Sequence, residues 1–176
     1  RVGVNAGSLD PRILREEGGV TAQALKRSAL EAAALLEETG FHDICLSLKA
    51  SNPRLCIEAT RLVAEACDYP LHLGVTEAGF SVSGVVRTAV GIGTLLAEGI
   101  GDTLRVSLTD EPVEEVHAAW LILSALSLRE RGPTLISCPG CGRTQVDIRQ
   151  SARAVEDYLK NKSSRIKVAV MGCAVN

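Results

Sequence analysis

The sequence predicts an α/β fold in which parallel strands alternate with helices, and three observations support this class. Short apolar segments recur roughly every 27 to 42 residues, an amphipathic helical pattern follows each one, and the segments look apolar on both faces, as in a sheet covered by helices. Four such βα units amount to half of a TIM-type (β/α)8 barrel, which typically takes about 250 residues, or to a small doubly wound sheet. The chain has 176 residues, so a barrel would be incomplete.

The expected elements follow from period and from start and stop signals. Strands are expected at Val2–Ala6, Ile44–Leu48, Leu71–Thr76 and Leu104–Leu108. Helices are expected at Ala22–Glu38, Pro53–Cys67, Val82–Glu98 and Val113–Arg129. Thr21 and Asn52 are suitable N-caps, and Gly40 is a suitable stop. In the last of these helices, Val116, Trp120 and Leu123 are expected to face inward.

The pattern changes at Gly132-Pro133, where we place a domain boundary: residues 1–131 form the first domain and residues 132–176 the second. The second domain holds an apolar segment from Thr134 to Ser137, a polar helix over about Ser151–Lys160 and a strand at Val168–Met171.

Composition excludes two classes of partner. With 3 % aromatic residues and 19 basic against 21 acidic residues, the chain does not resemble a nucleic-acid binder. Its longest apolar run, Val116–Leu128, is shorter than the roughly 18 residues that a membrane span needs. The single methionine is Met171, so we expect the chain to be a piece of a longer protein.

The six cysteines separate into two groups. Cys45, Cys56 and Cys67 stand singly among apolar neighbours, where a cysteine usually behaves as a small hydrophobic residue in a reducing compartment. Cys138 and Cys141 form a C-x-x-C pair, and Cys173 follows a strand and Gly172. Three thiolates fit an iron–sulfur cluster with one further ligand or an incomplete zinc ribbon, and a redox dithiol is a third interpretation.

Polar residues lie at the expected carboxyl ends of the four strands, where parallel α/β folds gather their working groups. These residues are Asn5, Lys49, Glu77, Arg105 and Ser107. The two cations suit an anionic ligand, and the carboxylate of Glu77 suits an acid, a base or an orienting group. His72 and Asp102 lie at the opposite strand ends, where we expect packing and hydrogen bonding, and we assign none of the three histidines a ligand role.

Six segments, in order along the whole chain, resemble one enzyme family, the 4-hydroxy-3-methylbut-2-enyl diphosphate synthases of the methylerythritol phosphate pathway. The segments are Val2-Gly-Val-Asn-Ala-Gly-Ser-Leu9, Gly74-Val-Thr-Glu-Ala-Gly79, Gly91-Ile-Gly93, Glu98-Gly-Ile-Gly-Asp-Thr-Leu-Arg-Val-Ser107, Ser137-Cys-Pro-Gly-Cys-Gly-Arg143 and Met171-Gly-Cys-Ala-Val-Asn176.

The resemblance implies a fold and an oxidoreductase activity. The family joins a substrate-binding TIM barrel to a smaller α+β domain that carries a 4Fe-4S cluster. It converts 2-C-methyl-D-erythritol 2,4-cyclodiphosphate to 4-hydroxy-3-methylbut-2-enyl diphosphate by two-electron reduction, with ferredoxin or flavodoxin as donor. The members are homodimers, and the implied compartment is the bacterial cytoplasm or the plastid stroma. On this basis, residues 1–131 would be the C-terminal half of the barrel and residues 132–176 the start of the iron–sulfur domain.

The resemblance also implies roles for particular residues. Cys138, Cys141 and Cys173 match the cluster ligands, and the fourth ligand, a glutamate in an Asn-Gly-Pro-Gly-Glu segment, would follow Asn176. Contacts to the substrate and its diphosphate would come from Asn5, Lys49, Arg105 and Ser107. Glu77 matches the carboxylate that transfers a proton. The alternative is a zinc-stabilised barrel protein that binds a phosphorylated ligand without redox chemistry.

Overall fold

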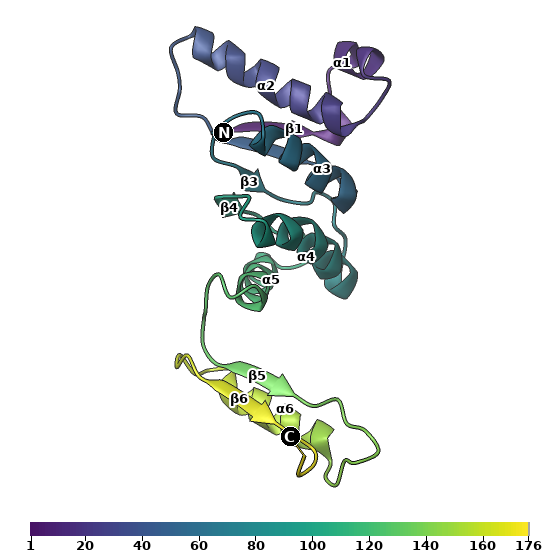
Figure 1. Cartoon of the computed structure of the whole chain (residues 1–176), viewed down its shortest axis with the longest axis vertical. Coiled ribbons are helices and arrows are strands. Elements are labelled where there is room, and N and C mark those ends of the chain that lie inside the picture. Colours follow the sequence, from purple (N-terminus) through teal and green to yellow (C-terminus); the bar gives the residue numbers. More distant parts are fainter. Residues whose placement is uncertain (176) are drawn as a thin grey trace. The chain divides into compact units, whose positions relative to one another are not determined.

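The structure, a computed structural model, describes residues 1–175 and forms two compact units, Arg1–Leu126 and Ser127–Asn176. Each unit is treated by itself. In the first unit strands and helices alternate along the chain (Figure 1), which confirms the α/β class. Its elements are β1 (Val2–Asn5), the short 3-10 turn η1 (Ala6–Ser8), α1 (Pro11–Glu16), α2 (Ala22–Glu38), β2 (Leu46–Lys49), α3 (Pro53–Ala64), β3 (His72–Leu73), α4 (Ser81–Ala97), β4 (Thr103–Leu104) and α5 (Pro112–Ala125).

The four strands of the first unit are parallel and lie in chain order. β1 pairs with β2 and β3 pairs with β4, while a bridge between Leu46 and Leu71 joins the two pairs. Each strand is shorter than expected, yet backbone pairing continues beyond β4, because the amide of Arg105 donates to the Leu73 carbonyl at 2.9 Å. The carboxyl ends of all four strands therefore lie along one edge.

The two faces of these strands differ, so the prediction that both are apolar is wrong. One face carries Val4, Leu46, Leu48, Leu71 and Leu73, all buried in the core. In parallel register, the neighbouring positions turned to the other face are polar or glycine: Gly3, Ser47, His72 and Thr103. Short strands conceal this alternation in the sequence, because each presents only one or two residues to the polar face.

The helix starts follow the expected capping chemistry. The side chain of Thr21 accepts a hydrogen bond from the Ala24 amide at 3.1 Å, and that of Asn52 accepts one from the Arg54 amide at 2.9 Å, which confirms both N-caps. Gly40, with φ of 80°, follows the end of α2. α1 was not predicted, although Asp10 caps it and proline opens it.

The inward face of α5 differs in part from the prediction. Ala118 and Ile122 are buried, Trp120 and Leu123 are partly buried as expected for inward positions, and Val116 is 53 % exposed. α5 also ends at Ala125 rather than Arg129, and Ser127 has a φ of +55° that no continuing helix adopts. The apolar residues of this helix surround it on several sides, so periodicity alone did not select one face.

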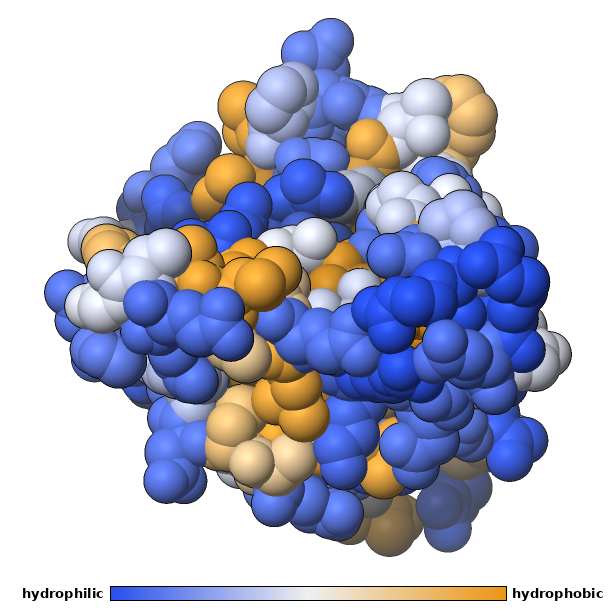
Figure 2. Space-filling model, turned by 90° about the horizontal axis from the view of Figure 1, so that it is seen from above, coloured by the Kyte–Doolittle hydropathy of each residue, from blue (hydrophilic) through white to orange (hydrophobic). Residues whose placement is uncertain are grey.

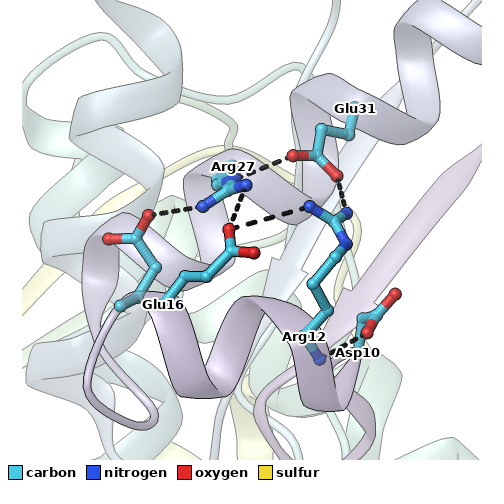
Figure 3. Close-up of polar contacts among 6 residues, drawn as sticks. Asp10, Arg12, Glu16, Arg27 and Glu31 are labelled. Atoms are coloured by element: carbon cyan, nitrogen blue, oxygen red, sulfur yellow. Dashed lines mark hydrogen bonds and ion pairs between the residues drawn. The ribbon is translucent and has the colours of Figure 1, made fainter.

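Charged residues on α1 and α2 and in the turn between them form a network (Figure 3). The Arg27 guanidinium contacts Glu16 at 2.6 Å, Glu17 at 3.1 Å and Glu31 at 2.7 Å, and Arg12 donates to Glu31. Hydrogen bonds first from Arg12 and then from Arg27 hold the pKa of Glu31 below its usual value. The groups are exposed or only partly buried, so the network fixes how α1 lies on α2 more than it adds stability.

The second unit contains β5 (Thr134–Ser137), α6 (Ile148–Leu159) and β6 (Lys167–Val170), with β5 and β6 parallel. α6 begins three residues earlier than expected, because Asp147 accepts from the Gln150 amide at 2.9 Å and caps it. Among residues 127–175, Leu159 has the single fully buried apolar side chain. This unit therefore has little hydrophobic core.

Within the described residues, no helix is long and apolar enough to span a membrane. Exposed hydrophobic residues are nevertheless present, among them Val82, Val86 and Val90 along one side of α4. On the face drawn in Figure 2, hydrophobic residues are interrupted by hydrophilic ones.

Candidate functional site

Three of the residues expected at the strand ends lie in one row. Asn5 is the last residue of β1 and pairs in register with Lys49, the last residue of β2. Continuing across the sheet, the next positions in this row are Gly74 and Arg105, since His72 pairs with Thr103 two residues earlier. Residues in one row of a parallel sheet point to the same side, so the amide and the two cations face a common space.

The end of the Lys49 side chain lies against Gly74, the residue that follows β3. A Cβ atom placed on Gly74 would lie 3.0 Å from Lys49 Cε and 3.5 Å from Lys49 Nζ. Burial, with the positive charges of Arg105 and Arg1 nearby, lowers the pKa of Lys49 to about 8. Within residues 1–175 Lys49 forms no ion pair with a carboxylate, so an anionic ligand would supply the missing countercharge.

Arg105 and Ser107 are joined directly. Arg105 Nε donates to Ser107 Oγ at 2.9 Å, and both residues follow β4 with one buried residue, Val106, between them. The contact holds the guanidinium in one orientation at the strand end. A fixed guanidinium binds phosphate oxygens with less loss of side-chain entropy than a mobile one.

Glu77 lies in the loop between β3 and α4 and has a φ of +55°, which is rare outside glycine. The loop is tied on both sides: the Thr76 amide donates to Ala50 at 3.2 Å, and the Thr109 amide donates to Gly79 at 3.0 Å. The Glu77 side chain is exposed. A strained conformation held by neighbouring loops supports a functional interpretation of this carboxylate.

Below the row of strand ends, the polar face carries His72 and Ser47. His72 Nδ1 is 2.8 Å from Thr103 Oγ1, while His72 Nε2 and Ser47 Oγ are buried without a hydrogen-bond partner among the described residues. Burial and then the charge of Lys49 lower the pKa of His72 to about 4, so its imidazole is neutral near pH 7. Asp102 accepts from the Leu71 amide at 2.8 Å, which confirms its structural role.

The second candidate site is the loop after β5 together with the segment after β6. The Cys138 amide donates to Val170 at 3.0 Å, so the two strands remain paired up to the cysteine. Thr144 then links the two segments. Its hydroxyl accepts from the Cys141 amide at 2.8 Å, and its side chain lies against Gly172, the residue before Cys173. All three cysteines therefore lie at the same end of the β5–β6 pair.

The three thiols are chemically suited to a soft metal centre. Cys138 and Cys173 are partly exposed and Cys141 is exposed, and the Gly140 amide donates to Cys138 Sγ at 3.3 Å. Within the described residues, no three His, Cys, Asp or Glu side chains are close enough to enclose a metal ion. Asn176, which precedes the expected glutamate ligand, lies outside the described residues. The donor set fits an iron–sulfur cluster or zinc by its chemistry.

The other three cysteines differ from one another. Cys56 is buried, accepts from the Ala50 amide at 3.0 Å and has a pKa raised by burial. This confirms its assignment to the core. Cys45 and Cys67 are only partly buried.

The sequence reasoning missed two residues of the first site. Arg1 adds positive charge near Lys49 and His72, and Gly74 provides the space that Lys49 occupies. Gly74 opens the motif that contains Glu77. A glycine in a strand shows that something approaches closely there, but it does not show what, so nothing in the sequence linked Gly74 to Lys49.

Comparisons with known proteins cover the whole chain. Residues 1–120 match the family model described as the GcpE TIM-barrel domain, and residues 134–176 match that of the GcpE protein C-terminal domain.

Curated relatives carry a single enzyme name, 4-hydroxy-3-methylbut-2-en-1-yl diphosphate synthase (flavodoxin). The protein of Ruminiclostridium cellulolyticum is 53 % identical over 100 % of this chain and 50 % of its own length. That of Salinispora arenicola is 55 % identical, with 45 % of its length covered, and that of Caldanaerobacter subterraneus is 54 % identical, with 50 % covered. The chain thus spans about half the length of these relatives. By these matches, and in agreement with the resemblance of its motifs, the chain belongs to the GcpE family.

Proposed function

We propose that this chain is part of a 4-hydroxy-3-methylbut-2-enyl diphosphate synthase. The protein would open the ring of 2-C-methyl-D-erythritol 2,4-cyclodiphosphate and remove a hydroxyl as water, using two electrons and a proton. The observation that carries the proposal is the row of Asn5, Lys49 and Arg105 at adjacent strand ends, in a chain about half identical to the curated synthases described above.

The cationic row would bind the diphosphate. Lys49 and Arg105 would neutralise its oxygens, and Ser107 would keep the Arg105 guanidinium oriented through the 2.9 Å contact. Asn5, in register with Lys49, would donate its side-chain amide to the same ligand. His72, which lies beneath the row and is neutral near pH 7, adds no positive charge to it.

Glu77 would move the proton. Loss of a hydroxyl as water requires a proton at the leaving oxygen, and Glu77 stands on a loop fastened to the ends of β2 and β4. The left-handed backbone of Glu77, in a loop held by these hydrogen bonds, would fix the point from which its carboxylate extends.

Cys138, Cys141 and Cys173 would hold a 4Fe-4S cluster, with a glutamate from beyond residue 176 as fourth ligand. When bound, the cluster supplies the two electrons, which it receives from flavodoxin or ferredoxin. The amide of Gly140, which donates to Cys138 Sγ, would stabilise thiolate charge at that ligand.

The two units would correspond to two domains: residues 1–131 to the C-terminal half of a TIM barrel, and residues 132–176 to the beginning of the iron–sulfur domain. Four parallel strands in chain order support the first assignment, and the position of the three cysteines supports the second. The intact protein would act as a homodimer in a bacterial cytoplasm. The exposed valines of α4 would be covered by the rest of that assembly.

Anaerobic purification of the intact protein tests this proposal. We expect a brown protein with about four iron atoms per chain that reduces the cyclic diphosphate when given a strong chemical reductant. A colourless protein with stoichiometric zinc and no reduction of the cyclic diphosphate would establish the zinc-stabilised alternative instead.

A further inference from the structure

We infer that Gly74 is a positioning residue for the anion site, because its missing side chain leaves the space beside the Arg105 backbone that the end of the Lys49 side chain occupies. This inference rests on the proposed diphosphate-binding function. It assigns Gly74 a role through Lys49 and not through the strand's own conformation.

The backbone of Gly74 does not require glycine. Its φ is outside the positive region that eight other glycines of the described chain occupy. Alanine would therefore adopt the same backbone angles without strain. The reason for glycine must be sought in the space around it.

That space is occupied by the site itself. A Cβ at Gly74 would meet Lys49 Cε at 3.0 Å, the Arg105 carbonyl oxygen at 3.2 Å and Lys49 Nζ at 3.5 Å. All three neighbours belong to residues that we assign to the anion. The two nearest contacts are closer than ordinary carbon contacts, so the lysine or the β4 backbone would have to move.

Other close-packed glycines serve a different purpose. A Cβ on Gly91 would meet Val75 Cγ2 at 2.5 Å, and one on Gly101 would meet Leu73 Cδ1 at 2.4 Å. Those side chains belong to the core. Gly74 is distinguished because the contact it permits is to the end of a half-buried lysine on the polar face.

The position of Lys49 has a chemical consequence. Lying against Gly74, the amine is half-buried and close to Arg105, and these surroundings lower its pKa to about 8. A methyl group at position 74 would displace the end of the lysine, and its displacement away from this half-buried place would raise its pKa toward the ordinary value. The same displacement would move the ammonium away from a diphosphate held by Arg105.

The test compares Gly74→Ala with the unsubstituted intact protein by two measurements. The first is the pH dependence of acetylation of Lys49 by acetic anhydride, followed by peptide mass spectrometry. We expect a midpoint near pH 8 without substitution and a measurably higher midpoint in Gly74→Ala. The second is the affinity for inorganic diphosphate at pH 7, which should fall by on the order of tenfold, as when one charged hydrogen bond is lost.

Gly93→Ala is the matched control, because a Cβ on Gly93 meets nothing within 4 Å. It should leave both measurements unchanged. An unchanged Lys49 midpoint in folded Gly74→Ala would overturn the inference, whatever the affinity. If the unsubstituted protein binds no diphosphate while its Lys49 midpoint shifts as expected on substitution, the proposed function fails and the positioning role stands.

A second variant distinguishes an effect of Gly74 on Lys49 from an effect on the Arg105 carbonyl. It can also be used if Gly74→Ala alone does not fold. In a Lys49→Ala background the lysine contacts are gone and only the 3.2 Å contact to the carbonyl remains. The double variant, Gly74→Ala with Lys49→Ala, should fold. Its affinity for inorganic diphosphate should be less than threefold below that of Lys49→Ala alone. A further tenfold loss, or failure of the double variant to fold, would show that Gly74 acts on the β4 backbone and would overturn the inference.

Discussion

The candidate sites of the two units differ in how much hydrophobic core supports them. In Arg1–Leu126 the site stands on strands whose other face is fully buried, so Lys49, Arg105 and Asn5 are already in one row without a ligand. In 127–175 the three cysteines lie at one end of a small βαβ unit with a single buried apolar side chain among the described residues. A hydrophobic core can preorganise a site, whereas a unit without one depends on the bound metal for its order.

The largest expected effect is on the second unit. In the intact protein Cys173→Ser should abolish the visible absorbance of the cluster and all turnover, and should make residues 127–175 sensitive to proteolysis, while amide hydrogen exchange in 1–126 stays unchanged. Cys67→Ser is the control, because this partly buried thiol lies in the first unit, packs at the edge of its core and donates to the Val63 carbonyl at 3.5 Å. Retention of the full visible spectrum in Cys173→Ser would remove that residue from the ligand set.

A large effect without loss of structure is expected at Glu77. Glu77→Gln keeps the size and exposure of the side chain but cannot deliver a proton, so turnover should fall by about 100-fold or more while substrate binding is retained. Steady-state kinetics and equilibrium binding separate the two quantities, and Glu114→Gln, an exposed carboxylate on α5, is the matched control. Near-normal turnover in Glu77→Gln would refute the proton-transfer role.

The dependence of the first unit on its core can be measured at Leu25, a fully buried residue of α2. Leu25→Ala should lower the free energy of unfolding of this unit by about 2–5 kcal/mol, the usual cost of such a cavity. Leu159→Ala should instead leave the first unit unaffected. Hydrogen exchange resolved by peptide measures both, and equal destabilisation of the two units by either variant would show that they unfold together.

The smallest effect is a pH dependence at Lys49. A lysine with a pKa near 8 is charged below pH 7 and loses its charge as pH rises through 8, so its contribution to anion binding is lost in that direction. The affinity for inorganic diphosphate relative to that of Lys49→Arg should fall about tenfold from pH 7 to pH 9. The ratio removes the ligand's own titration. A ratio that does not change with pH would mean that Lys49 keeps an ordinary pKa.

The sequence predicted much of this arrangement from local signals. α2 begins and ends where expected, because Thr21 and Gly40 are local caps. The strand-end residues were found because parallel strands deliver their carboxyl ends to one edge. The inward face of α5 was predicted only in part, because a helix apolar on several sides is oriented only by its neighbours.

By itself, the sequence determined the alternation of strands and helices, the positions of the helix caps, the group of cysteines in the second unit and the family to which the chain belongs. Those features depend on residues close together in the chain or on motifs that recur unchanged. Only the tertiary structure decided that the strands have a polar face, that Glu77 has a left-handed backbone and that Gly74 makes room for Lys49. Each of these depends on contacts between segments distant in sequence, and no local pattern specifies which side chain fills a given space.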